Sequence, residues 1–189
     1  IAKAAEALKG ADRQAESLAE MLADIGVPGL ETSYPQVSIR NSNYSLINGD
    51  IVVDGRRVDR RFGELISERA VSYSTAKRCT INGKPYMVGA LPRINNNRRL
   101  LSPRALEAIE TLGIGEYDGN PFKIPLAQVA ETIHLLEESY IILSDARPPG
   151  RPKPTGQVRG MGEATIEAPR GLLHISLKID GGRIVGINI

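Results

Sequence analysis

Three titratable side chains fall within eight residues near the end of the chain. Glu167, Arg170 and His174 lie in the string EAPRGLLH, and the chain has only two histidines. A carboxylate and a guanidinium three residues apart could position a charge for proton transfer, and histidine titrates near neutral pH. The alternative is an ordinary hairpin, in which residues 169–171 form the bend, Glu167 pairs with Arg170 and His174 takes an alternating strand position. The residues alone favour the hairpin.

The glycines before this string do not form a nucleotide-binding loop. Gly160 and Gly162 precede an expected strand, whereas a phosphate-binding loop runs from a strand into the start of a helix. The other histidine, His134, lies on an expected helix beside Glu131, with no second histidine or cysteine close in sequence. This spacing is too sparse for a metal site, so we expect an interhelical or solvated histidine.

The single cysteine is a second candidate for chemistry. Cys79 follows Lys77 and Arg78, whose positive charges would favour the thiolate form. A nucleophile also needs a base and oxyanion donors, and the sequence places neither of them. We expect an inert thiol. One cysteine cannot form an internal disulfide, which fits a reducing compartment and a cytoplasmic location.

The charge and hydropathy patterns exclude two classes of partner. The chain of 189 residues has 24 Lys and Arg against 22 Asp and Glu, a net charge of +2 that argues against nucleic-acid binding. Its arginine pairs are isolated and typical of solvated faces. No apolar run approaches the roughly 20 residues that span a bilayer, so we expect no membrane span.

The periodicities that position these residues predict an α+β fold, with a helical-bundle core, small antiparallel β units and a C-terminal hairpin. We expect helix over 1–26 and 102–145, mixed structure over 30–100, a loop over 146–160 and β structure over 163–189. The pattern predicts a further helix over 60–71 and an irregular segment over 89–97. Ser102-Pro103 predicts a capped helix start, and Asp54-Gly55, Asn82-Gly83 and Asp180-Gly181-Gly182 predict tight turns.

Three longer stretches resemble the large (alpha) subunit of nickel-iron hydrogenases, in order and approximate spacing. They are ERAVSYSTAKRCTINGKPYMVGALPRINNN, NPFKIPLAQVAETIHLLEESYIIL and GMGEATIEAPRGLLHISLKIDGGRIVGINI. The resemblance is closest to the cytoplasmic branch that reduces coenzyme F420 or NAD(P). It implies a parent enzyme that catalyses reversible oxidation of dihydrogen. The implied partners are an iron-sulfur small subunit and a cofactor-reducing subunit.

The family holds its nickel-iron centre with four cysteines in two CxxC motifs, and this sequence contains neither motif. The resemblance therefore maps the chain onto a central fragment that holds no cofactor itself and is inactive alone. We expect such a fragment to self-associate through exposed apolar surface. On this basis Glu167, Arg170 and His174 are predicted to be buried polar support near the active-site cavity, with no catalytic role.

A shorter string also matches the family pattern. Tyr86, Gly89 and Arg93 fit the family's Y-x-VGALxR string, but Pro92 stands where the family has alanine before the arginine. This departure leaves the local backbone conformation open. The alternative to a hydrogenase is a metal-free relative that acts as a scaffold or quinone-site subunit in a complex I-like assembly. The Ala168-Pro169-Arg170-Gly171 string favours the hydrogenase.

Overall fold

A computed structural model describes residues 2–145, 150 and 159–189 of the chain. The helices are α1 (Ala2–Ala23), α2 (Phe62–Leu65), α3 (Ala90–Asn97), α4 (Pro103–Thr111) and α5 (Ile124–Asp145), with 3-10 turns at Arg98–Leu100 and Pro121–Lys123. The strands are β1 (Val37–Arg40), β2 (Asp50–Val53), β3 (Arg56–Arg57), β4 (Ile66–Val71), β5 (Ser74–Ile81), β6 (Gly160–Ala168), β7 (Gly171–Asp180) and β8 (Arg183–Asn188). The predicted α+β class is confirmed.

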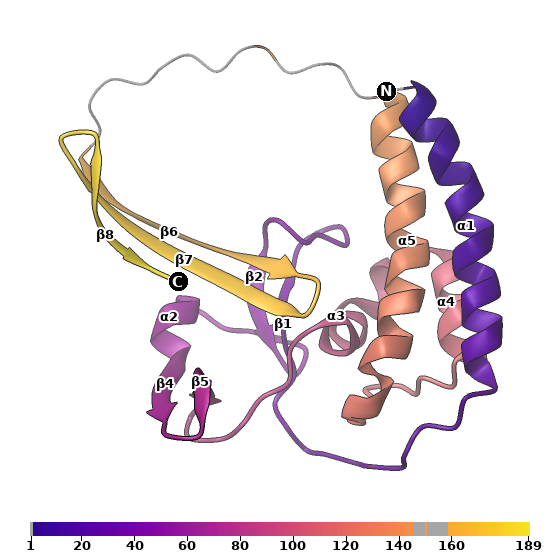
Figure 1. The fold of residues 1–189 in the computed structure, drawn as a ribbon, viewed down its shortest axis with the longest axis horizontal. Coiled ribbons are helices and arrows are strands. Elements are labelled where there is room, and N and C mark those ends of the chain that lie inside the picture. The colour runs from indigo at the N-terminus through magenta and orange to yellow at the C-terminus, as the bar shows by residue number, and fades with distance from the viewer. Residues whose placement is uncertain (1, 146–149, 151–158) are drawn as a thin grey trace.

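The two long helices form the bundle with α4. Helices α1 and α5 run antiparallel along each other, with α4 packed beside them (Figure 1). Their core is almost entirely aliphatic, as the low aromatic content requires, and Ala19, Ala130 and Ile133 are each at most 3% exposed. Ser102 caps α4 by accepting a hydrogen bond from the Ala105 amide at 3.3 Å, as predicted.

Helix α3 lies where the sequence predicts an irregular segment, so the prediction for 89–97 is wrong. Its three consecutive asparagines have low helix propensity, but all eight of its residues are buried, and tertiary contacts stabilise it instead. The Asn96 amide donates to the backbone oxygen of Gln36, and the Asn97 amide to that of Ile39, which fixes α3 against β1. Pro92 fits because it lies in the first helical turn, whose amides have no intrahelical acceptor.

Two small antiparallel sheets fill the segment between α1 and α3. They have the strand orders β1-β2-β3 and β4-β5. The turn at Asp54-Gly55 has two positive φ angles of 48° and 74°, and that at Asn82-Gly83 has 49° and 75°, as tight hairpin turns require. The predicted helix over 60–71 is wrong beyond its first turn. Only Phe62–Leu65 is helical. The next residues, Ile66–Val71, form a strand that pairs with β5, and the strand begins and ends with a β-branched residue, which favours extended structure.

The C-terminal unit is a three-stranded sheet, in the order β6-β7-β8, rather than a simple hairpin. Strand β6 pairs with β7 along its whole length, from Gly160 opposite Ile179 to Ala168 opposite Gly171. The end of the β6–β7 pair near residue 170 lies over β1 and beside the bundle, and the other end extends away from it (Figure 1). Most of the predicted loop over 146–160 lies outside the described residues.

Candidate functional site

A buried arginine lies where the bundle meets the C-terminal sheet. The Arg93 side chain, from α3, is 2% exposed. Its Nε and Nη2 donate to the two carboxylate oxygens of Glu131 on α5, at 2.5 and 2.6 Å. Its Nη1 donates to Glu167 Oε2 on β6 at 3.1 Å. The remaining donors reach the backbone oxygens of Ala168 at 3.0 Å and Pro169 at 3.1 Å. All five guanidinium N–H groups therefore have acceptors, contributed by two different elements.

The carboxylate of Glu131 joins Arg93 to a tyrosine. The Tyr44 hydroxyl donates to Glu131 Oε1 at 2.5 Å. Burial raises the pKa of Tyr44 well above its ordinary value, and the nearby charge of Glu131 raises it further, so the hydroxyl stays protonated. Burial also opposes the charge of Arg93, but hydrogen bonds to Glu131 and its negative charge outweigh this effect, and the pKa of Arg93 is raised. The guanidinium is therefore permanently charged.

Glu167 points inward from β6 and its side chain is fully buried. Besides the Arg93 ion pair, Glu167 Oε1 accepts a hydrogen bond from the Ile39 amide at 2.9 Å, and the Glu167 amide donates to the Leu46 oxygen at 2.7 Å. Burial raises the pKa of Glu167, although Arg93 acts in the opposite direction. The prediction that Glu167 is a buried polar group is confirmed. Its ion-pair partner is Arg93 and not Arg170, so a local Glu167–Arg170 pair is not formed.

The turn after Glu167 is held from several sides. Arg93 binds the carbonyls of Ala168 and Pro169, and Gln128 Nε2 donates to the Pro169 oxygen at 3.4 Å. Gly89 has φ +103°, and a Cβ there would lie 3.2 Å from the Arg170 oxygen. Only glycine accommodates this conformation together with such a close approach.

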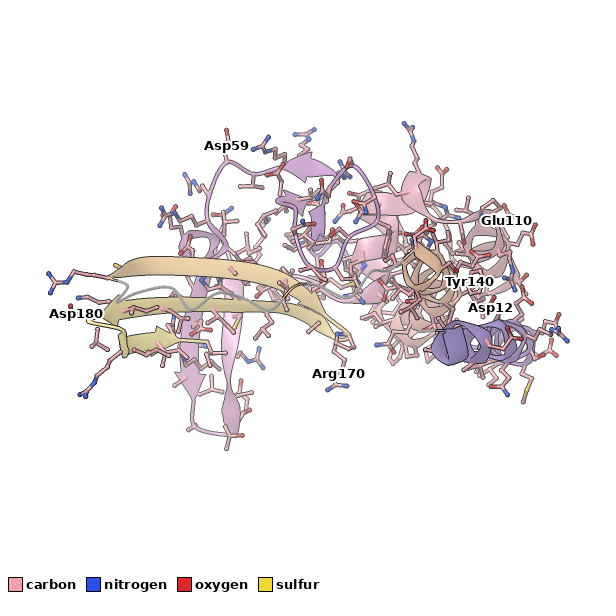
Figure 2. All side chains as sticks on the ribbon, turned by 90° about the horizontal axis from the view of Figure 1, so that it is seen from above. Asp12, Asp59, Glu110, Tyr140, Arg170 and Asp180 are labelled. Carbon is pink, nitrogen blue, oxygen red and sulfur yellow. The ribbon has the colours of Figure 1, made fainter. Side chains whose placement is uncertain are left out.

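Arg170 is exposed, contrary to the prediction that it is a buried support. Figure 2 shows its side chain leaving the ribbon at the end of the hairpin, on the side towards the helical bundle. The carbonyls of the two preceding residues, Ala168 and Pro169, accept hydrogen bonds from Arg93, whereas the Arg170 side chain is exposed. A fixed turn therefore presents a solvent-accessible cation.

His174 lies on the same sheet face as Glu167 but contacts a different element. Its Nδ1 is 2.9 Å from Thr165 Oγ1, and its ring centroid lies 5.8 Å from that of Phe62 on α2. A Cβ added to Gly63 would lie 3.2 Å from His174 Nε2, so α2 and β7 are closely packed here. His174 is half-buried, and the sheet brings it to α2 rather than to Arg170. The three residues are therefore separate: Glu167 forms a buried ion pair with Arg93, Arg170 is an exposed cation, and His174 packs against α2.

The other candidates do not form a reactive site. Cys79 lies in a cavity of about 400 Å³ beside Glu68 and Tyr86. Burial raises the pKa of its thiol, and Glu68 raises it further, which disfavours the thiolate. The Lys77 ammonium, expected to favour the thiolate, is instead bonded to Glu68 at 2.6 Å.

His134 lies between helices, which is the first of the two predictions, interhelical or solvated, that the sequence gives for it. The residue is 3% exposed, and its ring lies edge-on to Tyr44, with ring centroids 4.7 Å apart. Its Nδ1 accepts a hydrogen bond from the Ser102 amide at 3.1 Å, at the start of α4. Burial lowers the pKa of His134, despite nearby glutamates, so the ring is neutral at pH 7. Within the described ranges, no group of three or more His, Cys, Asp and Glu side chains is placed to hold a metal ion.

Sequence reasoning missed Tyr44 and the role of Glu131. Glu131 carries a signal, because it follows Ala127 by four residues and precedes His134 by three, which places a carboxylate on the buried face of α5. A glutamate at such a position needs a buried cation. Tyr44 lies in a loop between β1 and β2 and carries no comparable signal.

The chain is similar in sequence to two hydrogenase subunits. No known protein-family profile matches the sequence. The chain is 36% identical over 127 residues to the sulfhydrogenase 1 alpha subunit of Pyrococcus furiosus, which covers 66% of this chain and 30% of that protein. It is 30% identical over 161 residues to the sulfhydrogenase 2 alpha subunit of the same organism, or 81% of this chain and 37% of that protein. The chain thus spans about a third of the length of these relatives.

The solved structures that share this fold are also hydrogenases. An NAD+-reducing [NiFe]-hydrogenase in its H2-reduced state superposes with a TM-score of 0.69 at 23% identity, over 97% of this chain and 45% of that one. A [NiFeSe]-hydrogenase of Dm. baculatum superposes with a TM-score of 0.51 at 20% identity, over 75% of this chain and 37% of that one. The chain shares its fold with nickel-iron hydrogenases. Its described helices include none that is long and apolar enough to cross a membrane.

Proposed function

We propose that the chain forms the central part of a nickel-iron hydrogenase large subunit, whose parent enzyme catalyses the reversible oxidation of dihydrogen. Two observations support this proposal. The curated relatives are sulfhydrogenase alpha subunits, and the fold is shared with an NAD+-reducing [NiFe]-hydrogenase over 97% of the chain. The Glu167–His174 string that resembles the family is also the part of the sheet that the buried arginine holds.

The observation that carries the proposal is the fixed turn with an outward arginine. Arg93 binds Glu167 and two consecutive backbone carbonyls, and the exposed Arg170 follows them directly. Such a turn positions a guanidinium without the cost of ordering its backbone when a ligand or cofactor lies opposite. We propose that Arg93 and Glu167 are positioning residues, that His174 packs the hairpin on α2, and that Arg170 faces the active-site cavity.

The residues of this chain do not fit as ligands of the nickel-iron centre. Such a centre requires several soft thiolates, and the chain has one cysteine, whose raised pKa and contact with Glu68 favour the thiol. We therefore propose that other segments of the parent supply the metal ligands. On this view the 189 residues alone are inactive, and their contribution is the shape and charge of the support around the centre.

The electron acceptor and the partners follow from the same proposal. One of the solved structures with this fold is an NAD+-reducing hydrogenase. The sequence strings resemble the hydrogenase branch that reduces coenzyme F420 or NAD(P). We propose a soluble cofactor as the acceptor, a cytoplasmic location, and a complex with an iron-sulfur small subunit and a cofactor-reducing subunit.

The test uses the full gene product, purified together with its partner subunits. Elemental analysis is expected to find about one nickel per large subunit, and hydrogen uptake is followed with a dye acceptor. A nickel-free complex without hydrogen uptake would contradict the proposal and favour the metal-free scaffold or quinone-site subunit instead.

A variant of the exposed arginine tests the role of the turn in the same complex. Arg170→Lys keeps the charge but loses the planar guanidinium, and we expect hydrogen uptake to fall by about 100-fold at unchanged nickel content. Arg99→Lys, at an exposed arginine after α3, is the matched control and keeps full activity. Equal activity of the two variants would show that Arg170 does not face the reacting centre.

A further inference from the structure

The two faces of the C-terminal sheet differ in polarity. On the face towards the rest of the chain, Glu163 forms an ion pair with Arg61 at 3.2 Å, and Glu167 and His174 make the contacts described above. Side chains on adjacent strands that are paired in register share a face. Thr165 therefore joins this inner face, opposite His174. The inner face of the sheet is the polar one.

The outer face of the same sheet is aliphatic. The alternate residues of β7 on this side pair with alternate residues of β6 and β8. A shift in register next to Ile179 places Ile184 opposite it. The resulting outer face consists of Ala164, Ile166, Ala168, Leu173, Ile175, Leu177, Ile179, Ile184 and Ile187, together with Gly160, Gly162 and Gly171, and its turn end at Gly171 lies against Val88. Its three strands contribute no charged residue to it.

Within the described residues, this outer face is exposed at its two edge strands and partly buried along its centre. The exposed members include Ala164, Ile184 and Ile187, and the partly buried ones are Ile166, Leu173, Ile175, Leu177 and Ile179. Ile184 is 61% exposed and Ile187 is 58% exposed. A Cβ added at Gly160 or at Gly162 would meet no atom within 4 Å. Leu172, which points to the inner face, packs against the buried cluster of Val37, Ile39, Ile51 and Ile81. None of the outer aliphatic residues packs against that cluster or against the core of the helical bundle.

We propose that the outer face of the β6-β7-β8 sheet binds the same face of a second copy of this chain. A face without charges is complementary to itself, because no like charges meet when two copies stack. Two such sheets pack about 10 Å apart and interdigitate their aliphatic side chains, as in a β-sandwich. The inference goes beyond the proposed function and does not depend on it.

The size of the face fits a weak, closed dimer. Strand β7 has 10 residues. At about 3.3 Å per residue and about 4.8 Å between strands, the face is long enough to bury on the order of 1,000 Å² in total when two copies stack. Specific interfaces begin at about this size. The dimer is therefore expected to be weak and to end at two copies, since each copy has one such face.

The test is analytical ultracentrifugation of the 189-residue chain from about 1 µM to about 1 mM, with reductant present so that Cys79 cannot cross-link copies. The unaltered chain is expected to shift from monomer to dimer across this range. Ile187→Lys places a charge on the outer face and is expected to weaken the dimer about tenfold or more. Asn188→Lys adds the same charge one residue further on, to the opposite face of the strand, and should leave the dimer within twofold of the original.

A second outer-face variant guards against a folding defect. Ile184→Lys is expected to act like Ile187→Lys, and circular dichroism checks that each variant keeps the helix and strand content. A chain that stays monomeric at the highest concentration would overturn the proposal and leave the face to a different occupant. So would a dimer that Ile187→Lys and Asn188→Lys weaken equally, or growth beyond two copies.

Discussion

The two ends of the β6–β7 pair are held in opposite ways. At the end near the turn, a buried arginine binds one carboxylate and two carbonyls of the hairpin, and glycines let the backbones approach closely. At the other end, the strands extend away from the bundle (Figure 1), and Ile184 and Val185 are exposed there. Polar contacts thus fix where the sheet attaches, and the apolar residues are left for another surface.

The difference between the two ends shows that the contacts that orient the hairpin are not the contacts that contribute most to its stability. Hydrophobic burial is non-directional, so an aliphatic face alone would let the hairpin slide or turn over. Three of the five hydrogen bonds from the Arg93 guanidinium go to the hairpin and define a single orientation of the turn, although a buried ion pair adds little net stability over an apolar replacement. We infer that the network is retained for the position of residues 168–171.

The largest expected effect comes from removing the guanidinium. Arg93→Met leaves Glu131 and Glu167 buried without their counter-charge and two carbonyls without a donor. Loss of one member of a buried ionic network costs about 3–5 kcal/mol of unfolding free energy. Urea unfolding followed by circular dichroism measures this loss.

The control for that variant is Arg99→Met, at an exposed arginine six residues away. It is expected to change the unfolding free energy by less than about 0.5 kcal/mol. If the two substitutions lower the unfolding free energy equally, the buried network contributes no more to stability than a surface charge. The two ends of the sheet would then not differ in how they are held.

A pair of glycine substitutions compares the two ends directly. Gly171→Ala, at the turn, would place a Cβ 2.6 Å from Val88 Cγ2, a contact that a short, β-branched side chain cannot avoid. Overpacking of this kind costs about 1–3 kcal/mol. Gly162→Ala, at the far end, meets open space and restricts the unfolded chain, so it is expected to raise stability by a few tenths of a kcal/mol, up to about 1 kcal/mol. Thermal unfolding of the two variants should move the melting temperature in opposite directions.

The sequence predicts those elements whose signals are local. The long helices, the cap at Ser102 and the glycine turns all depend on residues within a few positions of one another, and each is confirmed. Helix α3 is not predicted, since its asparagines are poor helix formers and only their bonds to β1 make the helix favourable. The wrong prediction of helix over 66–71 has the same origin, because pairing with β5 makes this segment a strand.

The candidate site was predictable only in part. The string around Glu167 marks the right hairpin, and Arg93 belongs to a recognisable string of its own, but their pairing spans 74 positions. Nothing local distinguishes Arg93 from Arg170 as the partner of Glu167. The nearer arginine is exposed and the distant one is the partner, and this can be seen only once α3 and β6 are placed together.

The smallest expected effect is a pH dependence that tests the charge of the network. Burial raises the pKa of Glu167 above its ordinary value of 4.5, so the folded state holds a proton that the unfolded state releases as the pH rises past that value. The stability of the unaltered chain should therefore fall, relative to Glu167→Gln, from about pH 4.5 upwards, until the folded carboxyl also ionises. At pH 7 the glutamine has one side-chain oxygen for the two donors that Glu167 binds, the Ile39 amide and Arg93 Nη1. One of these donors therefore loses its acceptor, and the substitution should cost about 1–3 kcal/mol. Urea unfolding at intervals from pH 4 to pH 8 gives this difference. If the glutamine variant instead loses stability relative to the unaltered chain as the pH rises, the ionised Glu167–Arg93 pair stabilises the fold, and its role is more than orientation of the turn.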